Sequence, residues 1–146
     1  MRLLITLFAV AVLALTGCAT TGLSERQAAP LAYKALGQNA LLYCVEGASN
    51  PISGAMARAA LPASAPIVTS LVRVVSSASQ QSVRVAVAGD DSAYTAQVIK
   101  VALGSVPGDL PNLQLAFIGS RSHEAEVRRV VEGKRGKFTF EEAPPS

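Results

Sequence analysis

The second half of the chain switches regularly between the hydrophobic periods of a strand and of a helix. Residues 82–88 alternate strictly, with valines on one side and Arg or Ala on the other, as a strand requires. The segment Gly89-Asp90-Asp91-Ser92 follows, and it offers a turn and residues that cap helix N-termini. Apolar residues then recur at helical spacing as far as Gly104. The pattern therefore predicts a strand followed by a capped helix.

The same order then repeats further along the chain. Residues 113–118 alternate as a second strand, and 120–122 open a second helix whose buried stripe is made of valines. Gly133 is placed to end that helix, and 137–141 alternate as a third strand. Strands that alternate with helices predict an α/β fold with a βαβαβ unit and a mostly parallel three-stranded sheet.

The first half of the chain predicts short helices rich in alanine. Residues 31–78 are interrupted by several Gly and Pro residues, which argue against one long helix. The clearest helix covers 64–78, and weaker helical patterns cover 31–45 and 52–60. Residues 40–45 could equally form a buried strand. The whole predicts a small single α/β domain in which short helices precede the sheet.

The predicted strands have one bulky side and one thin side. The thin side is composed of small or polar residues, namely Arg84, Ala86, Ala88, Gln114, Ala116 and Thr139. A parallel sheet is normally covered on both faces, so we expect the alanine-rich helices between Leu31 and Ala78 to lie on this side. Any part that they leave uncovered would be a surface for a partner.

The chain begins with a short sorting signal rather than with a membrane-spanning helix. Arg2 precedes an unbroken apolar run from Leu3 to Leu15, which is too short to cross a hydrocarbon core of about 30 Å comfortably. A basic flank, a short apolar run and a small-residue end are typical of a secretory signal peptide. We therefore expect residues 1–17 to be removed.

The tetrapeptide Leu15-Thr16-Gly17-Cys18 resembles the lipobox of bacterial lipoproteins, and the resemblance covers residues 1–18 only. It implies a diacylglyceryl group on the sulfur of Cys18, cleavage before this residue, and anchoring of the mature chain to a membrane by lipid. Ala19 follows, where Asp often signals retention in the inner membrane. The resemblance thus favours the outer membrane, with the protein on its periplasmic face. The alternative is an ordinary secretory signal in which Cys18 falls by chance.

This organisation predicts four parts: the signal peptide over 1–17, the lipidated Cys18 with a tether over 18–30, one α/β domain over 31–142, and a disordered tail over 143–146. If Cys18 carries lipid, Cys44 has no other cysteine in its own chain. Its place in an apolar run favours burial as a small hydrophobe over an intermolecular disulfide or a reactive thiol.

Charge gives little reason to expect a nucleic-acid partner. The chain has a net charge of +3, and loss of Arg2 with the signal peptide leaves about +2. A basic cluster comprises Arg121, Arg128, Arg129, Lys134, Arg135 and Lys137. Interleaved glutamates, with Glu124 four residues before Arg128, indicate a solvated helix face more than an anion-binding surface.

A speculative ligand edge comprises Asp90, Asp91, Ser120 and His123, which follow the first two predicted strands of the second half. Open α/β sheets place ligands at the carboxyl ends of their strands, and carboxylates suit divalent cations. Capping of the next helix is the competing explanation for the aspartates. His123 has no evident nucleophile partner, and Glu126 is expected to point elsewhere.

No other motif points to catalysis or to a cofactor. The sequence contains no Gly-x-Ser-x-Gly elbow, and Ala88-Gly89-Asp90 does not complete a dinucleotide-binding loop. We therefore predict no catalytic residue, metal or cofactor, and no enzyme. The expected function is that of a membrane-anchored interaction or assembly component of a cell-envelope complex, with an envelope protein as its partner. The alternative is a small-ligand or metal-binding module that uses the carboxyl edge of the sheet.

Overall fold

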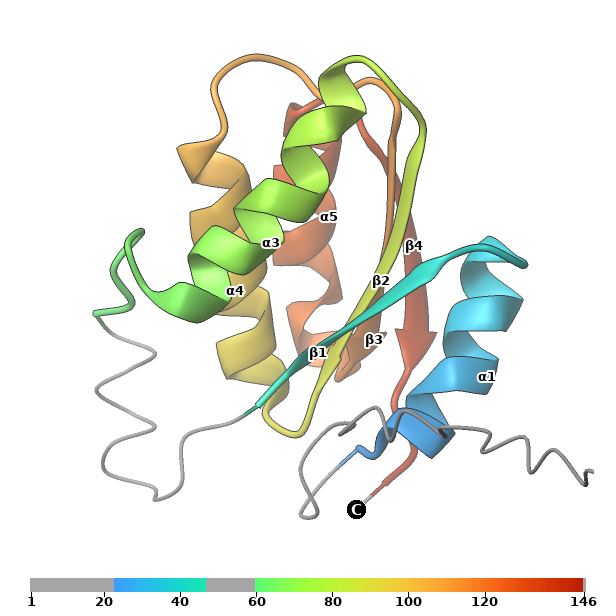
Figure 1. The fold of residues 1–146 in the computed structure, drawn as a ribbon. Coiled ribbons are helices and arrows are strands. Elements are labelled where there is room, and N and C mark those ends of the chain that lie inside the picture. Colours follow the sequence, from blue (N-terminus) through green and yellow to red (C-terminus); the bar gives the residue numbers. More distant parts are fainter. Residues whose placement is uncertain (1–22, 47–59, 146) are drawn as a thin grey trace, which may run out of the picture.

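The computed structural model describes residues 23–46 and 60–145, which form a parallel sheet with helices on both faces (Figure 1). The strands are β1 (Leu41–Val45), β2 (Val83–Gly89), β3 (Leu113–Gly119) and β4 (Lys137–Glu142). The helices are α1 (Glu25–Leu36), α3 (Pro66–Ser76), α4 (Ser92–Ser105) and α5 (Glu124–Gly133), with the 3-10 turns η1 (Ser77–Ser79) and η2 (Arg121–His123). Within these residues, no helix is long and apolar enough to cross a membrane.

The α/β class is confirmed, but the sheet has four strands rather than three, in the order β1-β2-β3-β4. The additional strand is β1, which comes from the run that could have been helix or strand. It pairs in parallel with β2, from Leu41 opposite Val85 to Val45 opposite Gly89. A run of five apolar residues is too short for its period to distinguish a helix from a strand. Pairing with β2 makes this segment a strand.

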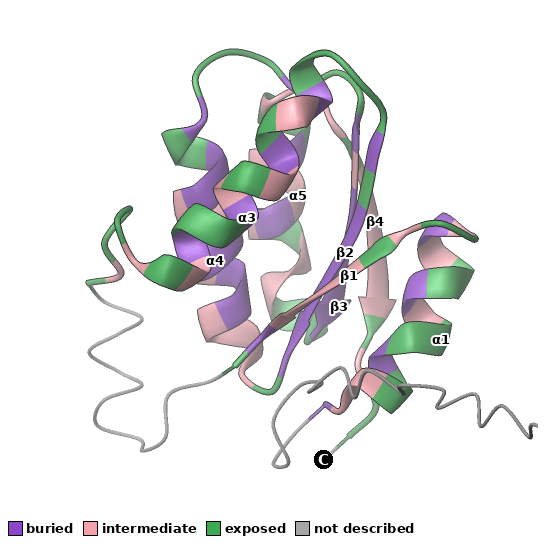
Figure 2. Cartoon of the chain, viewed as in Figure 1, coloured by how far each residue is buried: buried purple, intermediate pink, exposed green. Residues whose placement is uncertain are grey.

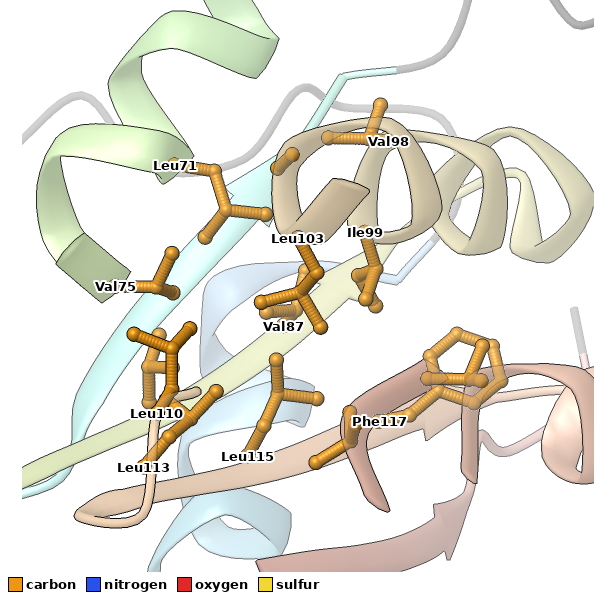
Figure 3. Packing of buried hydrophobic residues seen from close by; sticks show 14 of the residues in the cluster. Leu71, Val75, Val87, Val98, Ile99, Leu103, Leu110, Leu113, Leu115 and Phe117 are labelled. Carbon is orange, nitrogen blue, oxygen red and sulfur yellow. The ribbon is translucent and has the colours of Figure 1, made fainter. Parts of the chain in front are cut away.

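The winding of the chain places three helices on one face of the sheet. Strands that are consecutive in the chain are neighbours in the sheet, and the connections between them have the same handedness. The connecting helices α3, α4 and α5 therefore lie on the same face (Figure 1). Between them and the sheet lies the larger core, where Val87, Leu115 and Phe117 are fully buried. Leu71 from α3 and Ile99 from α4 reach the same layer (Figure 3).

The thin face of the sheet is covered by α1, while the other helices of the described residues lie on the opposite face (Figure 1). Ala28 and Ala32 of α1 pack in one cluster with Ala86 and Ala116 of the sheet. Both partners are small, so the helix can lie close to the strands without a void. The expected cover by an alanine-rich helix is thus found in α1, whereas α3 packs on the opposite face. Figure 2 shows buried residues along the inner side of α1 and exposed ones outside.

Helix α1 begins at Glu25, six residues before the helix expected from Leu31, so residues 25–30 are helical and not part of a tether. Ser24 caps it: its hydroxyl accepts from the backbone N–H of Gln27, and the Gln27 side chain accepts from the backbone N–H of Ser24. Sequence reading missed this capping box because alanines carry the buried stripe and Pro30 looks like a helix breaker.

Ala143, the first residue of the expected disordered tail, is hydrogen-bonded to the sheet. The backbone N–H of Ala143 donates to the carbonyl of Gly119 over 3.0 Å, which extends the path of β4 beyond Glu142. The helix expected over 52–60 lies outside the described residues except for Ala60.

Gly89 marks a close backbone approach that can be tested. A Cβ at this position would lie 2.6 Å from the carbonyl oxygen of Val45 and would also collide with the Thr95 hydroxyl. We expect Gly89→Ala to lower the free energy of unfolding by about 1–3 kcal/mol in urea denaturation, the usual cost of overpacking. Gly104→Ala is the matched control, because nothing lies within 4 Å of its added Cβ. A helix gains about 0.5–1 kcal/mol from that change. Equal stability of the two variants would contradict the close approach.

Candidate functional site

A pocket of about 540 Å³ opens at the carboxyl edge of the sheet. Its polar lining comes from Asp90, Ser92, Ser120 and Glu142, and its apolar wall from Leu23, Ala143, Pro144 and Pro145. Asp90 and Ser120 thus meet at this edge as the sequence predicts. Ser92, Glu142 and Leu23 were missed. Glu142 could have been found, because it ends β4 opposite Gly119 and parallel strands end at one edge.

Most polar groups at this edge have structural partners. Asp91 is the N-cap of α4: its carboxylate accepts from the backbone N–H of Tyr94 over 3.0 Å. The hydroxyl of Ser92 accepts from the backbone N–H of Ser120 over 2.9 Å and so ties the loops after β2 and β3 together. The capping explanation for Asp91 is therefore confirmed.

His123, the last residue of η2, lies apart from the pocket and pairs with a carboxylate of the following helix α5. Its Nδ1 is 3.0 Å from Oε1 of Glu126, and Nζ of Lys100 in α4 is 3.2 Å from Oε2 of the same residue. The expectation that Glu126 points elsewhere is wrong, because residues three apart share a helix face. The three side chains join α4 to α5, and His123 does not converge with Asp90.

The topology explains why this edge is not a deep crevice. Ligand crevices in open α/β sheets form where the strand order reverses and neighbouring helices diverge to opposite faces. The order β1-β2-β3-β4 contains no reversal. The pocket is instead enclosed by Leu23, which precedes α1, and by residues 143–145, which follow β4. Across residues 23–46 and 60–145, no three metal-ligating side chains come together.

Half of the basic cluster on and around α5 is paired with acids, namely Arg121, Arg128 and Arg135. Arg128 pairs with Glu124 over 2.8 Å, the ion pair expected from their spacing, and Arg121 pairs with Glu142 over 3.2 Å. The guanidinium of Arg128 also lies 4.8 Å from the ring centroid of Phe138. These contacts support a solvated, self-paired helix face.

Cys44 differs from the expected buried thiol. It is half-buried on the α1 face of the sheet, in register with Ala88, and it is disulfide-bonded. The chain contains only one other cysteine, Cys18, which lies outside the described residues.

Comparison with known proteins supplies no family for this arrangement. No protein-family model, curated protein or solved structure matches the chain.

The Glu126 pair predicts a pH dependence of stability. Partial burial raises the pKa of the Glu126 carboxyl, but hydrogen bonds from His123 and Lys100 outweigh it, so the pKa is lowered overall. A lowered folded-state pKa stabilises the protein above the unfolded pKa of about 4.3, and this contribution is lost as the pH falls through the folded value. We expect Glu126→Gln to cost at most about 1 kcal/mol at pH 6, since the pair is partly exposed. The difference from wild type should vanish toward pH 3.

Urea denaturation between pH 6 and pH 3 measures this effect. Glu46→Gln is the control, because Glu46 is exposed and has no ion pair within the described ranges. A constant difference for Glu126→Gln across this range would contradict the ion-pair assignment.

Proposed function

We propose that this protein is a bacterial lipoprotein, held at the periplasmic face of the outer membrane by lipid on Cys18, and that its domain is an interaction or assembly component of a cell-envelope complex. The observation that carries the proposal is the short distance along the chain between the lipobox cysteine and the folded domain. Leu23 is already buried against the sheet, only five residues after Cys18.

The length of this link limits where the domain can lie. Five residues span at most about 18 Å, so a lipid on Cys18 would keep the domain next to the bilayer. Leu23 lines the pocket together with Gly89 and Asp90, so the link leaves the domain at the carboxyl edge of the sheet. That edge would face the membrane, and the amino edge would face the periplasm.

The use of the polar residues favours interaction over catalysis. Asp91 caps a helix, His123 pairs with Glu126, and the loop serines bond to each other or to the backbone. A general base needs a nucleophile or a bound substrate within hydrogen-bond reach, and these groups are instead engaged within the fold.

The carboxyl-edge pocket supports a second candidate function, the binding of a small polar ligand. Its volume of about 540 Å³ lies within the range of small-molecule sites, and Asp90 and Glu142 give it an acidic lining. Glu142 is paired with Arg121, which reduces its capacity to bind a cation.

Replacement of the lipobox cysteine tests the first proposal. We expect Cys18→Ala to leave the chain uncleaved or to release it from the membrane fraction, whereas Cys44→Ala should stay cleaved and membrane-bound. Fractionation of cells and mass spectrometry of the mature N-terminus measure both outcomes.

Cys44 is disulfide-bonded in the structure, and in a chain with lipid on Cys18 its partner would have to be a cysteine of another molecule, so the mass measurement is decisive. The sulfur of Cys18 cannot be in a thioether with lipid and in a disulfide with Cys44 at the same time. A mature chain whose Cys18 is linked to Cys44, or has an unmodified sulfur, would refute the lipid anchor.

Divalent cations test the metal-binding form of the second candidate function. We expect 1 mM Ca²⁺ or Mg²⁺ to leave the melting temperature unchanged, because no three ligating side chains meet within the described part. A rise in melting temperature that Asp90→Asn abolishes would favour the ligand-binding function, whatever the state of Cys18.

A further inference from the structure

A second, smaller pocket of about 330 Å³ lies at the opposite, amino edge of the sheet, where β2 extends beyond β1. The pairing of these strands begins at Leu41 and Val85, so Arg84 lies one residue outside the part of β2 that pairs with β1. Helix α3 contributes Arg73 to the same pocket. We call this pocket the amino-edge notch; the rest of its lining is Asn39, Leu41, Val74, Ser77, Gln81, Ser82 and Val83.

The notch has two cationic side chains and no acidic one. Arg73 and Arg84 are exposed, and neither has an ion pair or a side-chain hydrogen bond with a partner among residues 23–46 and 60–145. Lys137 lies in the same row as Arg84 across the sheet, since Gln114 pairs with both residues. Two strand spacings, about 10 Å, separate them, so Lys137 adds to the positive potential.

This arrangement contrasts with that of Arg128 in α5. There Arg128 is held by glutamates one turn before and one turn after it. The residues around Arg73 and Arg84 are instead neutral amides, hydroxyls and apolar side chains. Their charge is therefore available to a ligand from outside the chain.

We propose that the amino-edge notch binds a carboxylate side chain from an acidic segment of a partner protein, with Arg73 on the α3 side of the notch and Arg84 on the α1 side of β2. Guanidinium groups present planar donors that match a carboxylate in a bidentate manner. Leu41 is 55% exposed at the rim and Val74 lies beside it, so an apolar residue next to the acid would be covered as well. A segment with an acidic residue next to an apolar one would therefore contact both the arginines and the apolar residues of the notch.

The position of the notch agrees with the proposed anchoring. The link to Cys18 leaves from the carboxyl edge, so in a lipidated protein the notch would face away from the bilayer, toward periplasmic partners. This orientation rests on the proposed function, whereas carboxylate binding by the two arginines does not.

Peptide titration of the full-length protein in detergent tests the notch. The probe is the tripeptide Glu-Leu-Glu with acetylated and amidated ends, followed by amide chemical shifts in nuclear magnetic resonance. We expect saturable shifts at Ser77 and at Ser82 to Arg84, weakened by salt, and none with Gln-Leu-Gln. Arg73→Gln and Arg84→Gln should each weaken binding at least about fivefold, because each removes one charge-assisted contact.

Arg129→Gln is the matched control, since Arg129 lies on α5 and has no ion pair in the described structure. It should bind the probe as the wild type does, and all three variants should keep the wild-type melting temperature. The proposal is overturned if Glu-Leu-Glu causes no shifts at 10 mM, if the three variants weaken binding equally, or if only a free C-terminal carboxylate or anionic phosphatidylglycerol vesicles bind. Failure of Cys18 lipidation would leave the titration unchanged, so the two proposals fail separately.

Discussion

Burial of the sheet on two faces of different depth governs this fold. Val87, Leu115 and Phe117 fill the larger core on one face, and their large side chains separate α3, α4 and α5 from the sheet. On the other face the neighbours of these residues along the strands are alanines, chiefly Ala86 and Ala116. Because side chains alternate across a strand, one sequence pattern fixes both depths at once. A single small-faced helix is then enough to complete the second layer.

The same winding limits what the carboxyl edge can do. Since the strand order never reverses, the three crossover helices begin side by side on one face, and the loops after β2 and β3 are free to bond to each other. Helix capping by Asp91 and the Ser92–Ser120 contact use the polar residues that the turn chemistry requires. The pocket at this edge comes from elements outside the βαβ repeats, which explains why its lining combines loop polar groups with Leu23 and the tail prolines.

Periodicity predicts those elements whose burial follows a clean pattern. Strands β2, β3 and β4 and helices α4 and α5 lie where the alternation and the helical spacing place them. The failures have separate causes. Strand β1 is too short to show a period, and α1 buries alanines around Pro30, so its stripe is weak although Ser24 and Gln27 mark its start. The site was predictable only in part, because spacing brings Asp90 and Ser120 to one edge but says nothing of the tail that closes the pocket.

The amino-edge notch shows why charge must be considered with its neighbours in space. In the sequence the arginines of α5 form the conspicuous cluster, and Arg73 and Arg84 stand singly eleven residues apart. The fold inverts this order: helix spacing supplies acids to Arg128, whereas the step at the start of β2 brings Arg73 and Arg84 to one pocket whose described lining contains no acid. Two exposed like charges that line one pocket repel, at a cost that solvent screening keeps small. An incoming carboxylate removes that repulsion and adds its own attraction, so the unpaired arginines favour an acidic ligand more than their number alone would indicate.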